Sequence, residues 1–197
     1  MGRDKALLPW PRQSPPHGNS VALPGTGGTL LSATIRALSS DCDLVLVVAG
    51  KNVEALRPIV YAEAAFLVCN PAPERGQFSS LQAGMREVLD RGRDTAMITL
   101  VDRPPARNDT LHALSRAFFR REHDIWALVP EYQGKHGHPI LVGREMIESF
   151  LRAPVNSSAR EVEHANQPHI SYWPVSDPLI TANINTIDDY LSLPAPQ

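Results

Sequence analysis

Short runs of hydrophobic residues, separated by amphipathic segments, recur along most of this chain. Six runs have the length and the valine, leucine and isoleucine content expected of buried β-strands. They occupy residues 43–50, 64–70, 95–102, 124–130, 138–143 and 169–175. Because the first three show no polar alternation, we expect these strands to be covered by helices on both faces.

Amphipathic segments lie between these runs. Residues 29–40 and 79–92 carry hydrophobic positions at helical spacing, and residues 109–122 do the same after Asp109, a favoured N-cap residue. A last helix is expected to begin after Thr186. The alternation of strands and helices predicts an α/β fold with three layers and a mostly parallel, Rossmann-like sheet.

Residues 9–28 are so rich in proline and glycine that we expect a loop there. The total of 197 residues fits a single domain spanning residues 1–197. The net charge of −2 gives no electrostatic case for a nucleic-acid or membrane partner. Since the sequence shows no signal peptide and no long apolar run, we predict a cytoplasmic protein.

The chain has two cysteines, Cys42 and Cys69, which form no CxxC motif. Cys69 belongs to the apolar run "AAFLVC", so we expect it to be a small buried thiol. Two such cysteines are compatible with a reducing compartment.

Polar residues follow three of the predicted strands, where α/β sheets bind their ligands. Asp102 ends one strand and precedes Arg103 and a pair of prolines, so its carboxylate suits a Mg²⁺ ligand or, alternatively, a turn residue. After the strand 64–70, Gly76, Ser79 and Ser80 open a helix and, together with Asn70, form a candidate nucleotide contact. The alternative is an ordinary capped helix.

Two later segments offer further polar groups. The loop "GKHGHP" contains His136 and His138, and too few companion ligands are present to favour zinc, so we interpret it as a substrate-facing loop or a structural turn. Asn183 and Asn185 precede the last helix and could form Asx turns or offer amide oxygens to a metal or nucleotide. The sequence contains no Walker loop, no Gly-x-Gly-x-x-Gly and no Gly-x-Ser-x-Gly elbow.

Five stretches, in this order, resemble the MobA/MocA-like nucleotidylyltransferases of molybdenum cofactor maturation. They are the opening "MGRDKALLP", "NPAPERGQFSSLQAG", "VDRPP", "GKHGHPIL" and "NINTIDDY". The first stretch matches only the second half of the family's opening motif, Leu-Ala-(Ala/Gly)-Gly-x-Ser-x-Arg-Met-Gly-x-x-Lys-x-Leu-Leu. We therefore expect a chain that starts late relative to the family and lacks its first central strand, which would leave two strand edges unpaired.

The resemblance implies a fold of the nucleotide-diphospho-sugar transferase type and a Mg²⁺-dependent transfer of a nucleotidyl group from CTP or GTP to the terminal phosphate of molybdopterin, with release of pyrophosphate. It also implies a role for each candidate residue. Lys5 and Asp102 would be catalytic; Gly2, Lys5, Asn70, Gly76, Ser79 and Ser80 would bind the nucleotide; Gly137, His138 and Pro139 would face the acceptor; and Asp102 and Asn185 would hold the metal. A molybdoenzyme or a cofactor-insertion chaperone would be a partner.

Three departures from the family pattern bear on activity. Asn185 replaces a frequent aspartate, Arg103 brings a positive charge beside Asp102, and the phosphate-binding half of the first motif is missing. Pro9 points towards the cytidylyl branch and "NINT" towards the guanylyl branch, and we favour CMP over GMP. The alternatives are a non-catalytic carrier or regulator of the cofactor and a nucleotidyltransferase for a sugar or alcohol phosphate.

Overall fold

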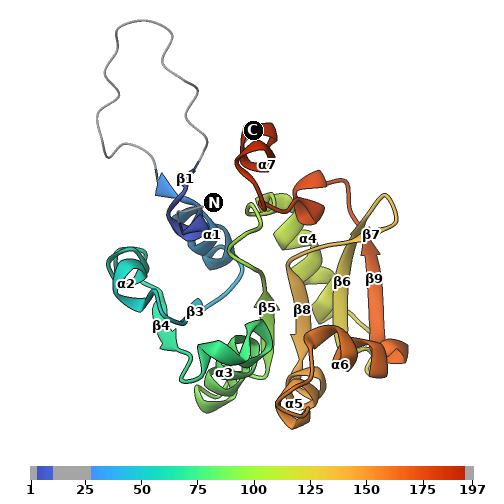
Figure 1. The fold of residues 1–197 in the computed structure, drawn as a ribbon. Helices are drawn as coiled ribbons and strands as arrows, with labels where there is room; N and C mark the ends of the chain where they lie inside the picture. The colour runs from blue at the N-terminus through green and yellow to red at the C-terminus, as the bar shows by residue number, and fades with distance from the viewer. Residues whose placement is uncertain (1–3, 11–27, 194–197) are drawn as a thin grey trace, which may run out of the picture.

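A computed structural model describes residues 4–10 and 28–193 of the chain (Figure 1). Its helices are α1 (Leu30–Ser39), α2 (Val53–Ala62), α3 (Gln77–Asp90), α4 (Asn108–Phe119), α5 (Arg144–Arg152), α6 (Ala159–Ala165) and α7 (Ile187–Ser192). Its strands are β1 (Pro9–Trp10), β2 (Gly28–Thr29), β3 (Leu46–Ala49), β4 (Phe66–Cys69), β5 (Thr95–Ile98), β6 (Ala127–Tyr132), β7 (Lys135–His136), β8 (Ile140–Gly143) and β9 (Ile170–Pro174). Four short 3-10 helices, η1 (Lys5–Leu7), η2 (Pro73–Arg75), η3 (Gln167–His169) and η4 (Pro178–Thr181), complete the description.

The predicted α/β class is confirmed, and the sheet pairing is mixed. β3 and β4 form a parallel pair, while β5, β8, β6, β7 and β9 form a second sheet. In that sheet β6 and β9 are parallel, whereas β8 runs antiparallel to both of its neighbours, β5 and β6. Strand direction is set by the β6–β7 hairpin, which brings the chain back as β8, and hydrophobic runs alone do not specify it.

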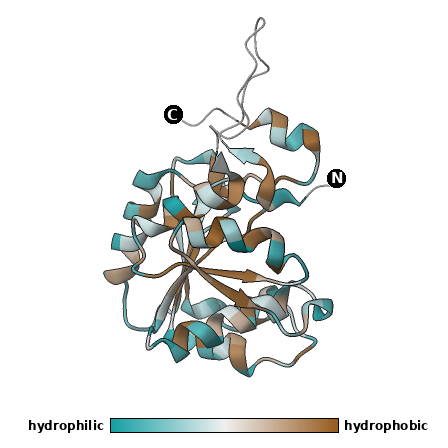
Figure 2. Ribbon diagram, turned by 90° about the vertical axis from the view of Figure 1, so that its left-hand side faces the viewer, coloured by the Kyte–Doolittle hydropathy of each residue, from teal (hydrophilic) through white to brown (hydrophobic). Residues whose placement is uncertain are grey.

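Helices cover both faces of the sheet, which gives three layers. On β6, Leu128 points to one face and packs with Leu114 and Phe118 of α4, whereas Ala127 and Val129 point to the other face, towards α3 and α5. This alternation follows from the two-residue period of a strand. Figure 2 shows the resulting distribution, with hydrophobic strands between helices whose outer surfaces are hydrophilic.

No strand lies between β3 and β5 in residues 4–10 and 28–193. Helix α3 nevertheless packs against β3, β4 and β5, and so it bridges the two sheets. The edges of β3 and β5 that face one another are therefore without a ladder partner among the described residues, as expected for a sheet that lacks its first central strand.

The structure also corrects several local expectations. Helices α2, α5 and α6 were not predicted, and the expected loop at 9–28 begins and ends with the paired strands β1 and β2. Helix α4 starts at Asn108, ahead of Asp109, the expected N-cap. Asp177, from a distant part of the chain, accepts a hydrogen bond from the backbone N–H of Arg107, the residue before the helix, at 2.8 Å. The described residues contain no helix long and apolar enough to cross a membrane.

Cys69 was expected to be buried and is exposed. It lies at the end of β4, which pairs only with β3 and carries a second exposed residue, Phe66, at its other end. β4 is thus the outer strand of its sheet. Its apolar composition predicts burial but does not reveal that one edge of the strand has no neighbouring strand among the described residues.

Candidate active site

Lys5 and Asp102 meet beyond the end of β5. Lys5 belongs to η1, which Asp4 caps by accepting a hydrogen bond from the backbone N–H of Ala6 at 3.0 Å. Its ammonium group lies 3.5 Å from the Asp102 carboxylate, and both side chains are about one-third exposed, at 29% and 32%. A cation and a carboxylate are therefore accessible together at the edge of the sheet.

A segment near the C-terminus, residues 180–184, runs across this edge and is called the strap below. Three backbone positions of the strap bond to the loops around Asp102. The Ile184 N–H donates to the Asp102 carbonyl at 2.8 Å, the Ala182 carbonyl accepts from Arg103 at 3.4 Å, and the Ile180 carbonyl accepts from the His138 N–H at 2.9 Å. The strap thereby brings the loop after β5 and the loop before β8 together.

The residue after the strap is Asn185, which directly follows Ile184, the strap residue bonded to Asp102. Asp189, a residue that the sequence analysis did not select, accepts hydrogen bonds from the backbone N–H groups of Asn185 and Thr186. These bonds lower the pKa of Asp189, and the charge of Lys5 lowers it further. The Thr186 hydroxyl accepts a hydrogen bond from the Asp189 N–H and caps α7, as predicted. The carboxylate of Asp189 is therefore part of a capping box at the start of this helix.

Asp102 and Asn185 offer hard oxygen donors, which suit Mg²⁺ or Mn²⁺ when phosphate oxygens and waters complete the coordination. The residues at 4–10 and 28–193 contain no group of three or more His, Cys, Asp and Glu side chains that could hold a metal by themselves. A zinc site at His136 and His138 is not supported, because His136 stacks on Tyr172 and lies 3.6 Å from Glu131. The donor set thus fits a metal that binds together with a phosphate ligand.

Asn70, Ser79 and Ser80 form a hydrogen-bonded network in the loop between β4 and α3. The buried Asn70 amide donates to the hydroxyl of Ser79 at 2.8 Å and to that of Ser80 at 2.9 Å, and its oxygen accepts from the Ala72 N–H at 2.9 Å. Ser79 in turn donates to the Gly76 carbonyl at 2.7 Å. The hydrogen-bonding groups of Asn70 and Ser79 are therefore used within the loop, which fixes its shape.

Gly76 caps α3 with φ +87°, a left-handed conformation that favours glycine, and a Cβ there would have no atom within 4 Å. Its loop contacts the turn after β3, because a Cβ on Gly50 would lie 2.8 Å from Pro73. The turn after β3 also contacts the start of η1, because the Asn52 side chain donates a hydrogen bond to the Asp4 carboxylate. These contacts connect the loop after β4 to the segment that carries Lys5, whereas Gly2 lies outside the described residues.

Gly137, His138 and Pro139 lead into β8. A Cβ on Gly137 would overlap the backbone carbonyl of Ile180, so only glycine allows the strap to approach this closely. Burial, together with the positive charge of Arg103, lowers the pKa of His138 to about 4, and the negative charge of Asp102 partly opposes this shift. His138 is therefore neutral near pH 7.

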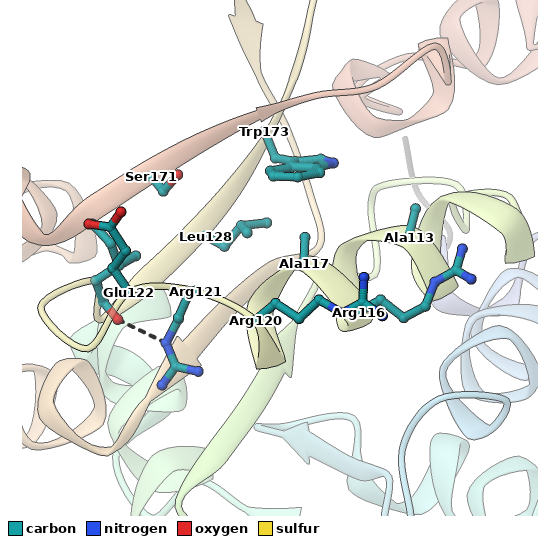
Figure 3. A pocket seen from close by; sticks show the side chains of 10 residues that line it. Ala113, Arg116, Ala117, Arg120, Arg121, Glu122, Leu128, Ser171 and Trp173 are labelled. Carbon is teal, nitrogen blue, oxygen red and sulfur yellow. Dashed lines mark hydrogen bonds between the residues drawn. The ribbon is translucent and has the colours of Figure 1, made fainter.

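A separate hollow of about 620 Å³ lies between α4 and β9 (Figure 3). Figure 3 shows Trp173 above it, Leu128 at its floor and the side chains of Arg116 and Arg120 along α4. It contains none of the candidate residues, since its lining comes from α4, the loop after α4, β6 and β9. The candidate active site is therefore distinct from this hollow.

Comparisons with known proteins agree with this geometry. A sequence model described as a MobA-like NTP transferase domain matches residues 1–169. No curated protein matches the chain. The structure of Rv0371c from Mycobacterium tuberculosis H37Rv is similar, with a TM-score of 0.73 and 21% identity over 97% of this chain and 88% of the other. The same protein was also solved in complex with manganese, with a TM-score of 0.70 and 21% identity over 96% of this chain and 91% of that one.

A nucleotidyl transferase from Methanothermobacter thermautotroptrophicus has a TM-score of 0.69 and is 20% identical, over 86% of this chain and 80% of the other. At these identities the structural matches establish the fold, and the sequence model establishes the family. Its match covers every candidate residue except Asn183 and Asn185, which lie beyond residue 169. The chain therefore belongs to the MobA-like NTP transferase domain family, a family of nucleotidyltransferases.

Proposed function

We propose that this protein transfers a nucleotidyl group from an NTP to the terminal phosphate of a molybdopterin-type acceptor. The observation that carries the proposal is the meeting of Lys5 and Asp102, 3.5 Å apart, beyond the end of β5. In the reaction an oxygen of the acceptor phosphate forms a bond to the α-phosphorus of the NTP. The bond from that phosphorus to the bridging oxygen breaks, and pyrophosphate leaves with the electron pair.

Lys5 would hold the phosphate oxygens of the NTP, where its charge balances the negative charge that develops on the leaving pyrophosphate. Asp102 and Asn185 would hold Mg²⁺, which when bound neutralises phosphate charge and acts as a Lewis acid. The strap keeps Asp102 and Asn185 together, because the Ile184 N–H is bonded to the Asp102 carbonyl. Since a phosphate dianion is already a competent nucleophile, no side chain has to remove a proton from it.

The loop between β4 and α3 would contact the base and ribose. Gly76 leaves open space above the backbone, and Ser80 has a hydroxyl at the start of α3, whereas Asn70 and Ser79 would position the loop. Gly2, outside the described residues, stays an expectation for the phosphates. Pro9 supports CTP as the donor, following its likeness to the cytidylyl branch.

The acceptor would lie near the loop of Gly137, His138 and Pro139 that leads into β8, with His138 as the half-buried residue of the three. A structure of a molybdopterin-guanine dinucleotide biosynthesis protein A from Archaeoglobus fulgidus supports this acceptor class only through its fold, with a TM-score of 0.54 and 17% identity over 74% of each chain. A molybdoenzyme or a cofactor-insertion chaperone would then receive the product.

The test is to measure the melting temperature of the full chain with CTP or GTP, each with Mg²⁺ or Mn²⁺, and then pyrophosphate release in the presence of molybdopterin. We expect CTP with metal to raise the melting temperature and pyrophosphate to appear once acceptor is added. Cofactor binding without pyrophosphate release would instead indicate a carrier, and turnover with sugar or alcohol phosphates but not with molybdopterin would indicate a different acceptor. No response to either nucleotide would overturn the proposal.

A further inference from the structure

Two buried side-chain nitrogens close to Asp102 have no hydrogen-bond partner in the described part of the chain. They are Nε of Arg103 and Nδ1 of His138. A buried polar atom without a partner costs free energy, and most such atoms in folded proteins are satisfied. Two of them in one site indicate that a ligand supplies the missing partner.

Both residues that carry these nitrogens are bonded to the strap. Ile180 accepts a hydrogen bond from the backbone of His138, and Ala182, two residues later, accepts one from the Arg103 guanidinium at 3.4 Å. The positive charge of Arg103 and the negative charge of Asp102 both act on the pKa of His138. Arg103 and His138 therefore adjoin the same short strap, next to Asp102.

The chemistry of this region favours an anion. The guanidinium of Arg103 is a permanent donor, and a neutral imidazole with its proton on Nδ1 is a second donor. Lys5 and Arg103 bring two positive charges to the neighbourhood of Asp102, whereas the carboxylates of Asp189 and Asp4 accept hydrogen bonds at the starts of α7 and η1. The two cations beside Asp102 suit a negatively charged ligand.

We propose that Arg103 and His138 form an anion subsite that holds the terminal phosphate of the acceptor. This inference rests on the proposed function. Arg103 is then a specificity-determining residue, because its charge favours a phosphomonoester and gives little to a neutral alcohol. The subsite also explains how a positive side chain is tolerated next to Asp102, since the bound phosphate would lie between the guanidinium and the metal.

The test uses inorganic phosphate as the probe, titrated by calorimetry into the full chain with and without saturating CTP and Mg²⁺. We expect R103Q to weaken phosphate binding by about tenfold or more, the loss typical of one charge-assisted hydrogen bond. Nucleotide affinity should stay within about threefold of that of the unaltered protein, because Lys5 and the β4–α3 loop are intact. R116Q, which removes an exposed arginine of α4 outside the site, is the matched control and should change neither affinity.

A second pair of variants tests Nδ1 of His138 directly and decides the matter if R103Q does not fold. The side-chain amide nitrogen of H138N can occupy the place of Nδ1, whereas that of H138Q lies nearer to the place of Nε2. We expect H138N to keep phosphate affinity within about threefold and H138Q to lose about tenfold. The subsite would be overturned if R103Q or H138Q bound phosphate as tightly as the unaltered protein does. It would also be overturned if the unaltered protein did not bind phosphate.

These outcomes differ from a failure of the proposed function. If CTP and GTP do not bind but R103Q still weakens phosphate binding, the anion subsite stands and nucleotidyl transfer fails. If nucleotide binds and R103Q leaves phosphate binding unchanged, the proposed function stands and the subsite fails.

Discussion

Lys5 and Asp102 are separated by 97 positions in the chain, and their charged groups lie 3.5 Å apart. The contact joins η1 to the loop after β5, and the strap holds the same loop from the other side through Ile184. An accessible ion pair of this kind adds only about 0–1 kcal/mol to stability. Its position at the ligand edge of the sheet therefore points to function more than to folding.

Replacing Asp102 with asparagine should separate catalysis from folding. The isosteric amide removes the negative charge that a metal needs, so we expect nucleotidyl transfer to fall at least about a hundredfold. The melting temperature should change by less than about 4 °C, because the ion pair is weak. Turnover is followed by pyrophosphate release and folding by circular dichroism, with R116Q as the control. Unchanged turnover in D102N would place the metal elsewhere.

The network in the β4–α3 loop predicts a coupled loss of stability. Removing the Asn70 amide leaves the Ser79 and Ser80 hydroxyls without a donor, so N70A should lower the free energy of unfolding by about 1–3 kcal/mol. S79A should cost less, and N70A/S79A should lose less than the sum of the single variants because the two residues share one network. Urea denaturation measures all three. Strict additivity would show that the hydrogen bond between them contributes nothing.

Gly137 should tolerate no side chain. A methyl group there overlaps the backbone of Ile180, so G137A should destabilise the protein by about 1–3 kcal/mol or displace the strap. G134N, in the turn between β6 and β7, is the matched control. The space around Gly134 is open and asparagine accepts its positive φ of 73°, so its stability should change by less than about 1 kcal/mol. Equal denaturation midpoints for the two variants would contradict the close approach of the strap.

The environment of His138 sets the sign of a pH effect. Burial and Arg103 lower its pKa from 6.5 to about 4, so the folded protein keeps this ring neutral while an unfolded chain would protonate it. Between those two values the unfolded state binds the extra proton, and this group therefore reduces stability as the pH falls. Histidine resonances followed by NMR should show one ring that titrates near pH 4 and is missing in H138Q. A titration of that ring near pH 6.5 would contradict the burial.

The two cysteines should differ in reactivity. Burial and, to a smaller extent, the neighbouring charges of Asp41 and Asp43 raise the pKa of Cys42 to about 11, so only about one thiol in a thousand is ionised at pH 8. Cys69 is exposed at the end of β4. We expect rapid labelling of one thiol by a disulfide reagent at pH 8, and loss of that rapid phase in C69S. A fast phase that persists in C69S would show that Cys42 is open to solvent.

The local patterns were sufficient for much of the fold. The hydrophobic runs located β5, β6, β8 and β9, and the amphipathic segments located α1, α3 and α4. Helix α2 was not predicted because Pro58 lies inside it, and proline normally argues against a helix interior. The antiparallel direction of β8 and the exposure of Cys69 depend on which strands become neighbours, and that information is not contained in a short stretch of sequence.

The candidate site, like the fold, could be predicted only in part from the sequence. Asp102 was selected from its place after a predicted strand and Lys5 from the family resemblance, and their charged groups lie together in the structure. The strap could not be anticipated, because Ile184 reaches Asp102 through backbone atoms whose bonding is independent of side-chain type. Asn70 and Ser79 were selected as ligand contacts, and their hydrogen bonds instead suggest that they shape the loop.

The most direct test of nucleotidyl transfer is to follow the label from CTP that carries ³²P at the α-phosphate. The full chain is incubated with this CTP, Mg²⁺ and molybdopterin, and D102N is run in parallel. The account predicts that the label moves to the acceptor in step with pyrophosphate release, and that D102N transfers at least about a hundredfold less. Label that stays on CTP with the unaltered protein, or that moves equally well with D102N, would contradict it.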